Sequence, residues 1–278
     1  MKDQTDHTGD PILRIAAALE RLSPPPKQTN WQAYPAYVWT GDGARGVEVL
    51  EAPPLGLLQG IERQKEAVTG NVHRLAQGFP AHDMLLWGAR GMGKSALLRA
   101  AVSSAQLEVH GKLALVQVGA DALTALVRLF SELAGVDRRF LVFIDDLGFG
   151  AGDTTGPRQL RSWLDGGVEA RPDNVRLAVT SNRRAILSRE AREQSDPLSP
   201  RDELDDQLAL ADRFGMALGF HVCSQDEYLA IIRGYAGEYG LDWDEAEALE
   251  WAKRRGARSG RVAWHFVTEL AGRAGKRL

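Results

Sequence analysis

The fold of this 278-residue chain is decided by one short stretch, Gly88-Ala89-Arg90-Gly91-Met92-Gly93-Lys94-Ser95. It fits the pattern G-x-x-x-x-G-K-[ST], in which glycines let the backbone curl so that successive N–H groups point inward at a phosphate group. The apolar residues Met84 to Trp87 predict a strand before it, and apolar residues at helical spacing predict a helix after it. A glycine turn with an accidental lysine is the weaker interpretation, because a phosphate-binding loop needs this strand–loop–helix context.

The same motif predicts a role for each of its polar parts. The backbone from Gly88 to Ser95 would wrap the phosphates, and Lys94 would reach the β- and γ-phosphates. The hydroxyl of Ser95 would ligate Mg²⁺. We therefore expect a nucleoside triphosphate with its magnesium ion at this loop.

A second acidic motif follows about fifty residues later in the chain. Phe140 to Ile144 is a continuous apolar run, which is typical of a strand buried on both faces of a parallel sheet. Asp145 stands at its carboxyl end, where such sites hold Mg²⁺ with a carboxylate. Asp146 could orient and activate the attacking water. The alternative is that two carboxylates simply begin a loop after a core strand.

The chain between Leu55 and Val222 alternates between predicted helices and predicted strands. Helices are expected from Ile61 to Gly78, after Lys94, and from Leu123 to Leu133. The expected strands are Met84–Trp87, Leu113–Val118, Phe140–Ile144, Val175–Val179 and Met216–Val222. This alternation predicts a doubly wound α/β fold around a parallel sheet. Together with the glycine-rich motif at 88–95, it predicts the three-layer sandwich of a P-loop NTPase.

We expect three parts: an N-terminal extension at 1–54, an α/β core at 55–222 and a helical lid at 223–278. In the extension, Ile12 to Leu22 has helical spacing, and prolines at 24–26 end that helix. The aromatic residues of the extension favour an arm pinned onto its own domain over one that grips a partner; they are Trp31, Tyr34, Tyr37 and Trp39.

The lid is predicted from helix signals after the last strand. Ser224 to Glu227 has the form of a capping box, and Asp242 to Glu245 repeats this signal for a second helix that Gly256 would end. A third helix carries Val262, Phe266 and Leu270. The segment 188–207 is expected to be an exposed, mobile loop. For the segment 148–156, which contains Phe149, a loop that faces a central pore and an ordinary loop both remain open.

Composition excludes several classes of protein. The net charge is −3 and basic clusters are local, so no general electrostatic attraction to nucleic acid is expected. Cys223 is the single cysteine, and the six histidines show no ligand spacing, which excludes an intrachain disulfide and argues against catalytic zinc. Apolar runs are too short for a signal peptide or a membrane span. We expect a soluble cytoplasmic protein without membrane contact.

From about Leu55 onward the chain resembles the AAA+ ATPases, and in particular a bacterial group known as domain of unknown function 815. The resemblance is carried by the segments 85–91, 160–174, Thr180-Ser181-Asn182-Arg183-Arg184, Ala211-Asp212-Arg213-Phe214-Gly215 and Ser259-Gly260-Arg261-Val262-Ala263-Trp264. It implies an ATPase with a parallel sheet in the order 5-1-4-3-2 and a helical lid. ATP with Mg²⁺ would lie where the core and the lid meet.

The resemblance also implies roles for three further residues. Asn182 is similar to the polar sensor that positions water against the γ-phosphate, although it could also cap a helix starting at Arg183. Arg213 resembles the arginine finger that reaches a neighbouring subunit's nucleotide. An ion pair with Asp212 is its alternative, and Arg183 and Arg184 are rival fingers.

Arg261 is similar to the second sensor, an arginine that links the position of the lid to the γ-phosphate. Arg258 competes for this role, because only one register can be right. One departure concerns Asp146, where many AAA+ motors carry glutamate. Aspartate is one methylene shorter, so slow turnover is a hypothesis.

Three functions follow from these expectations. The first is an ATPase that remodels a protein partner or complex, whose identity the residues do not indicate, while working as a homo-oligomeric ring or arc. The second is a binding switch in which ATP sets the angle of the lid and hydrolysis to ADP resets it. The third is a helicase-loader-like ATPase on DNA, suggested by Asp145-Asp146-Leu147-Gly148 but not favoured by the acidic balance.

Overall fold

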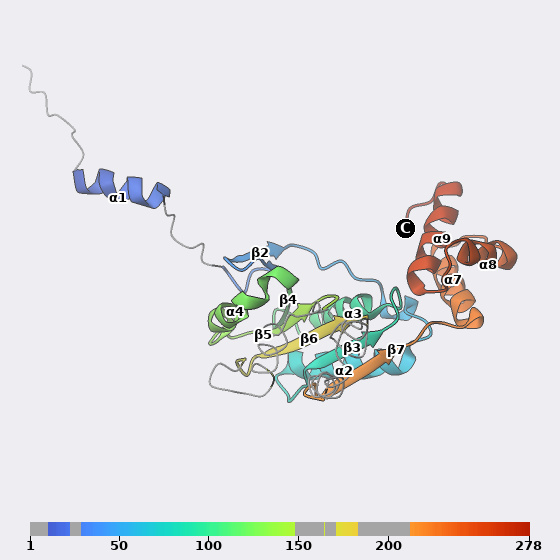
Figure 1. Cartoon of the computed structure of the whole chain (residues 1–278), viewed down its shortest axis with the longest axis horizontal. Coiled ribbons are helices and arrows are strands. Elements are labelled where there is room, and N and C mark those ends of the chain that lie inside the picture. The colour runs from blue at the N-terminus through green and yellow to red at the C-terminus, as the bar shows by residue number, and fades with distance from the viewer. Residues whose placement is uncertain (1–10, 23–28, 148–163, 165–170, 183–211) are drawn as a thin grey trace, which may run out of the picture.

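A seven-stranded sheet forms the centre of the described structure (Figure 1). The computed structural model describes residues 11–22, 29–147, 164, 171–182 and 212–278. Within these residues the sheet runs in the order β2-β1-β4-β5-β6-β3-β7. The strands are β1 Ala36–Trp39, β2 Ala44–Val47, β3 Met84–Gly88, β4 Leu113–Val118, β5 Arg139–Ile144, β6 Val175–Ser181 and β7 Met216–Phe220.

Five adjacent strands of the sheet, in the order β4-β5-β6-β3-β7, are all parallel to one another. Counted along the chain, β3 is the first of them and β7 the fifth, so their order is 5-1-4-3-2 as the resemblance implies. Their carboxyl ends share one edge of the sheet, which is where open α/β sheets bind ligands. Gly88, Asp145 and Asn182 all follow or end strands at this edge.

Helices cover both faces of the sheet. Helices α2 (Glu62–Gln77) and α3 (Lys94–Glu108) pack on one face, and α4 (Leu126–Leu133) packs on the other. Adjacent strand residues alternate between the two cores, because Leu86 packs with α2 and α3 whereas Leu85 packs with α4. Gly78 ends α2 in a left-handed conformation with φ of 82°, as the sequence predicts.

Two helical turns differ in detail from the expectation. A 3₁₀ helix, η2 (Ala120–Ala125), precedes α4, so the predicted helix from Leu123 to Leu133 is α-helical only from Leu126. Such tight turns are frequent at helix N-termini. A second 3₁₀ helix, η1 (Leu55–Leu57), lies ahead of α2.

The aromatic stretch packs into the chain's own core, as expected. Trp31, Tyr37 and Trp39 are buried, and the ring centroids of Trp31 and Tyr37 lie 4.8 Å apart. The Tyr37 hydroxyl donates to the carbonyl of Asn30 at 2.7 Å. The sequence did not predict that this stretch would supply β1, which pairs in parallel with β4, and β2, which pairs antiparallel with β1.

Helix α1 (Pro11–Leu22) confirms the helical spacing of the N-terminus and lies apart from the sheet in Figure 1. Its apolar side chains Ile12, Ile15 and Leu19 are exposed. The prolines at 24–26 lie outside the described residues, as do the segments 148–156, with Phe149, and 188–207. Within the described chain, no helix combines the length and the apolar character needed to cross a bilayer.

The part of the chain expected to form the lid contains α7 (Gln225–Tyr239), α8 (Glu245–Arg254) and α9 (Gly260–Arg273). The capping box at Ser224 is confirmed, with both of its reciprocal hydrogen bonds present. The second cap is Asp244 rather than Asp242: its carboxylate accepts from the backbone N–H of Glu247 at 2.8 Å. The prediction was two residues early because both aspartates suit a cap.

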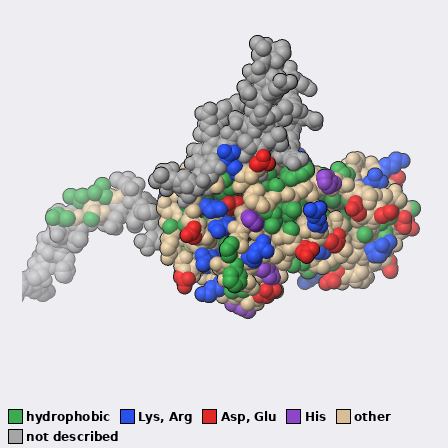
Figure 2. Space-filling model, turned by 90° about the horizontal axis from the view of Figure 1, so that it is seen from below, with side chains coloured by type: hydrophobic (Ala, Val, Ile, Leu, Met, Phe, Trp, Pro, Cys, Tyr) green, Lys and Arg blue, Asp and Glu red, His purple; other side chains and the backbone are tan. Residues whose placement is uncertain are grey.

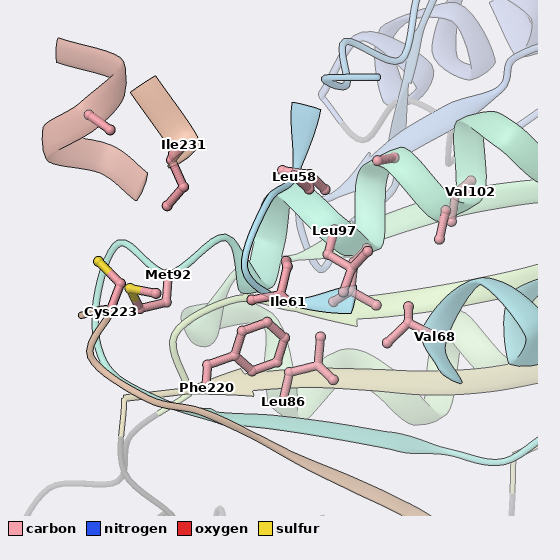
Figure 3. Packing of buried hydrophobic residues seen from close by; sticks show 14 of the residues in the cluster. Leu58, Ile61, Val68, Leu86, Met92, Leu97, Val102, Phe220, Cys223 and Ile231 are labelled. Atoms are coloured by element: carbon pink, nitrogen blue, oxygen red, sulfur yellow. The ribbon is translucent and has the colours of Figure 1, made fainter. Parts of the chain in front are cut away.

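The lid and the α/β core share one cluster of buried hydrophobic residues. Figure 3 shows Met92, Cys223 and Ile231 where the two parts meet. Met92 comes from the glycine-rich loop, Cys223 from the link after β7 and Ile231 from α7, and all three are buried. The loop is therefore packed against both parts of the molecule.

Candidate functional site

The loop between β3 and α3 is fixed by glycines that no other residue could replace without strain. Gly88, Gly91 and Gly93 have φ angles of 121°, 75° and 85°. A Cβ atom at Gly88 would lie 2.1 Å from the carbonyl oxygen of Phe220, at the end of β7. That same oxygen accepts the N–H of Ala89 at 2.8 Å. The start of the loop is therefore held against the neighbouring strand.

Lys94 begins α3 and is 7% exposed. Its ammonium group donates to the carbonyls of Gly88 and Ala89, both at 2.8 Å, and to the amide oxygen of Asn182 at 3.4 Å. Burial lowers the pKa of Lys94, while the carboxylates of Asp146 and Asp145 oppose this effect. The cation is thus held inside the loop by oxygen atoms that could give way to phosphate oxygens.

Asp145 receives two hydroxyl hydrogen bonds on the same carboxylate oxygen. Ser95 Oγ donates to Asp145 Oδ1 at 2.6 Å, and Thr180 Oγ1 donates to that oxygen at 2.6 Å. Thr180, 1% exposed, comes from β6 and was not predicted as a site residue. The sequence places Thr180 two residues before Asn182, but it does not show which way the Thr180 hydroxyl points.

Asp146 lies among polar groups from two other parts of the chain. Its carboxylate accepts from the side-chain amide of Asn182, which follows β6. The guanidinium of Arg90, from the glycine-rich loop, is 3.8 Å from its other oxygen. Asp146 is the single non-glycine residue with positive φ (51°) in the described part of the chain. Such strained backbone is concentrated at functional sites.

The lid contacts the loop through the start of α9. The backbone N–H of Arg261 donates to the carbonyl of Gly91 at 3.0 Å. A Cβ atom at Gly91 would lie 2.9 Å from Ser259 Oγ and 3.0 Å from Arg261 Cβ. Arg258 instead lies near Cys223. Burial raises the pKa of the Cys223 thiol, and the positive charge of Arg258 partly opposes this effect.

Arg213 lies just before the amino-terminal end of β7, whereas the glycine-rich loop lies at the carboxyl ends of the strands. It precedes Met216, the first residue of β7, whereas Phe220 at the end of β7 contacts the loop. Asp212 lies beside it on the exposed surface, and Arg213 has interactions of its own within the chain. The rival arginines Arg183 and Arg184 lie outside the described residues.

The donor set suits a magnesium–phosphate group better than a metal held by protein alone. Mg²⁺ prefers hard oxygen ligands and keeps several waters, so it is usually bound by one or two carboxylates together with phosphate. The Ser95 hydroxyl and the Asp145 carboxylate supply such oxygens. Among the described residues there is no group of three or more His, Cys, Asp or Glu that could hold a metal ion.

Comparison with solved structures finds the same fold in several proteins. The RuvB Holliday junction branch migration motor of Thermotoga maritima matches with a TM-score of 0.52 and 20% identity, over 82% of this chain and 68% of that chain. The ORC2 protein of Aeropyrum pernix, solved as ADPNP–ADP complexes, matches with a TM-score of 0.53 and 15% identity over 78% and 64%. The DNA-bound ORC1 protein of Aeropyrum pernix matches with a TM-score of 0.51 and 16% identity, over 82% and 66%.

The strand order, the three helices that follow β7 and these matches define the fold as that of the AAA+ P-loop proteins. The chain belongs to the family described as "Protein of unknown function (DUF815)", whose model matches residues 32–274. A search of the curated proteins found no match to this sequence.

Proposed function

We propose that this chain is an ATPase that couples ATP binding and hydrolysis to the remodelling of a protein partner or complex. The contact between Ser95 and Asp145 carries the proposal, since at 2.6 Å it joins the glycine-rich loop to the tip of the buried strand β5. A phosphate-binding loop and a magnesium carboxylate must meet in this way for phosphoryl transfer.

Each part of the site then has a role in holding MgATP. The backbone N–H groups of residues 88–95 surround the phosphates at the positive end of α3. Lys94 would exchange its carbonyl partners for β- and γ-phosphate oxygens, and Ser95 and Asp145 would hold Mg²⁺. The bound ion would neutralise negative charge on the oxygens of the β- and γ-phosphates.

Hydrolysis needs a water placed in line with the γ-phosphate. Asp146 and Asn182 are already hydrogen-bonded to each other at the end of the loop where that phosphate would lie. In this proposal Asn182 positions the water and Asp146 accepts its proton. Arg261, at the start of α9, contacts the γ-phosphate and so links the position of the lid to the presence of ATP.

Assembly is proposed because Arg213 lies at the sheet edge away from its own loop. An arginine placed there can act on a nucleotide only across a subunit boundary. We therefore propose that the chain works as a homo-oligomeric ring or arc. In this proposal the residues 1–54, 55–222 and 223–278 form an extension, a core and a lid. We also propose that the protein acts in the cytoplasm.

Calorimetry with MgATP and MgADP tests the nucleotide binding on which this function depends. The wild-type chain should bind both, and Lys94→Ala should lower the affinity for ATP by on the order of tenfold or more. Lys112→Ala is the matched control, because this exposed lysine lies before β4 and away from the loop. A wild-type chain that gives no heat of binding with MgATP and none with MgADP would contradict the proposal.

A second candidate is an ATPase directed to DNA. The matches to a branch migration motor and to a DNA-bound ORC1 protein favour it. Against it stand the net charge of −3 and the interspersed acidic and basic side chains on the face drawn in Figure 2. A binding constant for single-stranded DNA that falls steeply with salt would support this candidate over protein remodelling.

A further inference from the structure

Arg90 is the one basic side chain that the glycine-rich loop carries ahead of Lys94. The motif specifies nothing at this position, because only the backbone of the loop is needed to wrap phosphate. In the structure the guanidinium of Arg90 turns toward the acidic end of the site, where its Nη2 atom is 3.8 Å from Asp146 Oδ2. The side chain thus has a defined neighbour that belongs to the proposed catalytic group.

A continuous series of contacts links Arg90 to Lys94. Lys94 Nζ donates to Asn182 Oδ1, Asn182 Nδ2 donates to Asp146 Oδ1, and Asp146 Oδ2 faces Arg90. One cation therefore stands at each end of the Asn182–Asp146 pair. A γ-phosphate bound against this pair would have Lys94 on one side and Arg90 on the other.

The charges around the loop favour an anion at this place. Lys94 is influenced by two carboxylates, Asp145 and Asp146, and by two arginines, Arg90 and Arg261. Three cations thus converge with two carboxylates, and Mg²⁺ would offset the charge of Asp145. The positive charge that remains is suited to a triphosphate tail.

The pairing of Arg90 with Asp146 is too weak to hold the guanidinium back. The side chains are 76% and 59% exposed, and exposed ion pairs of this kind contribute little. A γ-phosphate carries more charge than one carboxylate and offers oxygens for bidentate contact with a guanidinium. Arg90 should therefore turn from Asp146 to the phosphate and leave the carboxylate free to act on water.

We infer that Arg90 is a further γ-phosphate cation beside Lys94 and Arg261, supplied within the same chain, and that it distinguishes ATP from ADP. This inference rests on the proposed function. It differs from the arginine-finger proposal, because Arg213 would act from a neighbouring subunit whereas Arg90 needs no partner.

The test compares ATP and ADP affinities, by calorimetry in the presence of Mg²⁺, for the wild type and for Arg90→Gln and Arg90→Lys. Arg90→Gln should weaken ATP binding by on the order of tenfold while changing ADP binding little, because only ATP has the γ-phosphate. Arg90→Lys keeps the charge but not the planar fork, so its ATP affinity should lie between the other two. Arg63→Gln, an exposed arginine on α2, is the control and should match the wild type.

The outcomes separate this inference from the function on which it rests. A wild-type chain that binds ATP, together with an unchanged ATP-to-ADP affinity ratio in Arg90→Gln, overturns the inference alone. Faster turnover in Arg90→Gln with that ratio unchanged also overturns it, because Arg90 would then only restrain Asp146. A wild-type chain that binds neither nucleotide overturns both proposals.

Discussion

The hydroxyl of Thr180 bridges the two neighbouring carboxylate residues, since it donates to Asp145 Oδ1 at 2.6 Å and accepts the backbone N–H of Asp146 at 2.8 Å. A single buried side chain thus fixes both the direction of the Asp145 carboxylate and the start of the turn that carries Asp146. Outer-shell partners of this kind orient the groups that ligate a metal. Thr180 is therefore a positioning residue for the proposed magnesium site.

Thr180→Val should raise the Mg²⁺ concentration needed for half-maximal ATP hydrolysis, by roughly tenfold. Valine has nearly the same shape, so the packing of β6 is kept while both hydrogen bonds are lost. Thr180→Ser retains the hydroxyl and should restore the wild-type magnesium dependence. A magnesium titration of the three proteins measures this, and equal midpoints for valine and threonine would contradict the assignment.

Gly88→Ala should unfold at lower temperature and lose nucleotide binding. Its Cβ would lie 2.1 Å from the Phe220 carbonyl oxygen, and its φ of 121° is unfavourable for any residue with a side chain. Gly237→Ala is the matched control: nothing lies within 4 Å of its added methyl group, and it sits inside α7. That variant should gain up to about 1 kcal/mol, because alanine is the better helix former. Thermal unfolding followed by circular dichroism compares the two, and similar melting temperatures would refute the claim.

Arg213→Ala should abolish ATP turnover but leave ATP affinity nearly intact, since the residue lies away from its own chain's loop. Fingers of this type contribute on the order of 10³ to 10⁵ in rate in related systems. The wild-type rate per chain should rise steeply with protein concentration, and Arg63→Ala should follow the wild type. Turnover that survives in Arg213→Ala would exclude the trans role. A very low rate at every concentration would favour a binding switch instead.

Tyr228 should make the stability of the chain fall as the solution becomes alkaline. Burial raises its pKa to about 12 from an ordinary value of 10.0, and its hydroxyl donates to the Ala248 carbonyl at 3.2 Å. The unfolded chain releases this proton first, so the stabilisation is complete below pH 10 and is lost as the pH rises to about 12. Tyr228→Phe should therefore show a shallower fall in melting temperature between pH 9 and pH 11, measured by calorimetric unfolding.

The control for this alkaline effect is Tyr34→Phe, because Tyr34 lies on the surface rather than in the lid core. The informative quantity is the difference in slope between each variant and the wild type. Identical slopes for the wild type and Tyr228→Phe would show that this phenol does not link folding to pH.

Much of the fold was predictable because its central strands are buried on both faces. Continuous apolar runs such as Phe140 to Ile144 mark such strands directly, and their alternation with amphipathic helices indicates the layers. Strands β1 and β2 were missed because each has only four residues, and β2 reads Ala-Arg-Gly-Val without an apolar pattern. Their pairing depends on β4, which is distant in sequence.

The candidate site was predictable where one local motif contains the chemistry. The loop needs glycines, a lysine and a hydroxyl at fixed spacing, so residues 88–95 are evident from the sequence alone. Thr180 and the side chain of Arg90 could not be assigned, because their roles depend on contacts across the sheet edge. The partner of Arg171 could not be assigned either. Arg171 lies in a segment that carries the family resemblance, and in the structure it forms an ion pair with the buried Asp83.

The hydrogen bond from Arg261 to Gly91 ties the last helix to the phosphate loop without any intervening residue. A change in the angle of α9 must therefore move or break a contact of the loop itself. Thermodynamic reciprocity then requires that a partner which binds the lid and shifts this helix alters nucleotide affinity by a certain factor. The nucleotide must alter the affinity for that partner by the same factor. An unknown partner could thus be sought through its effect on ATP binding, before its own chemistry is known.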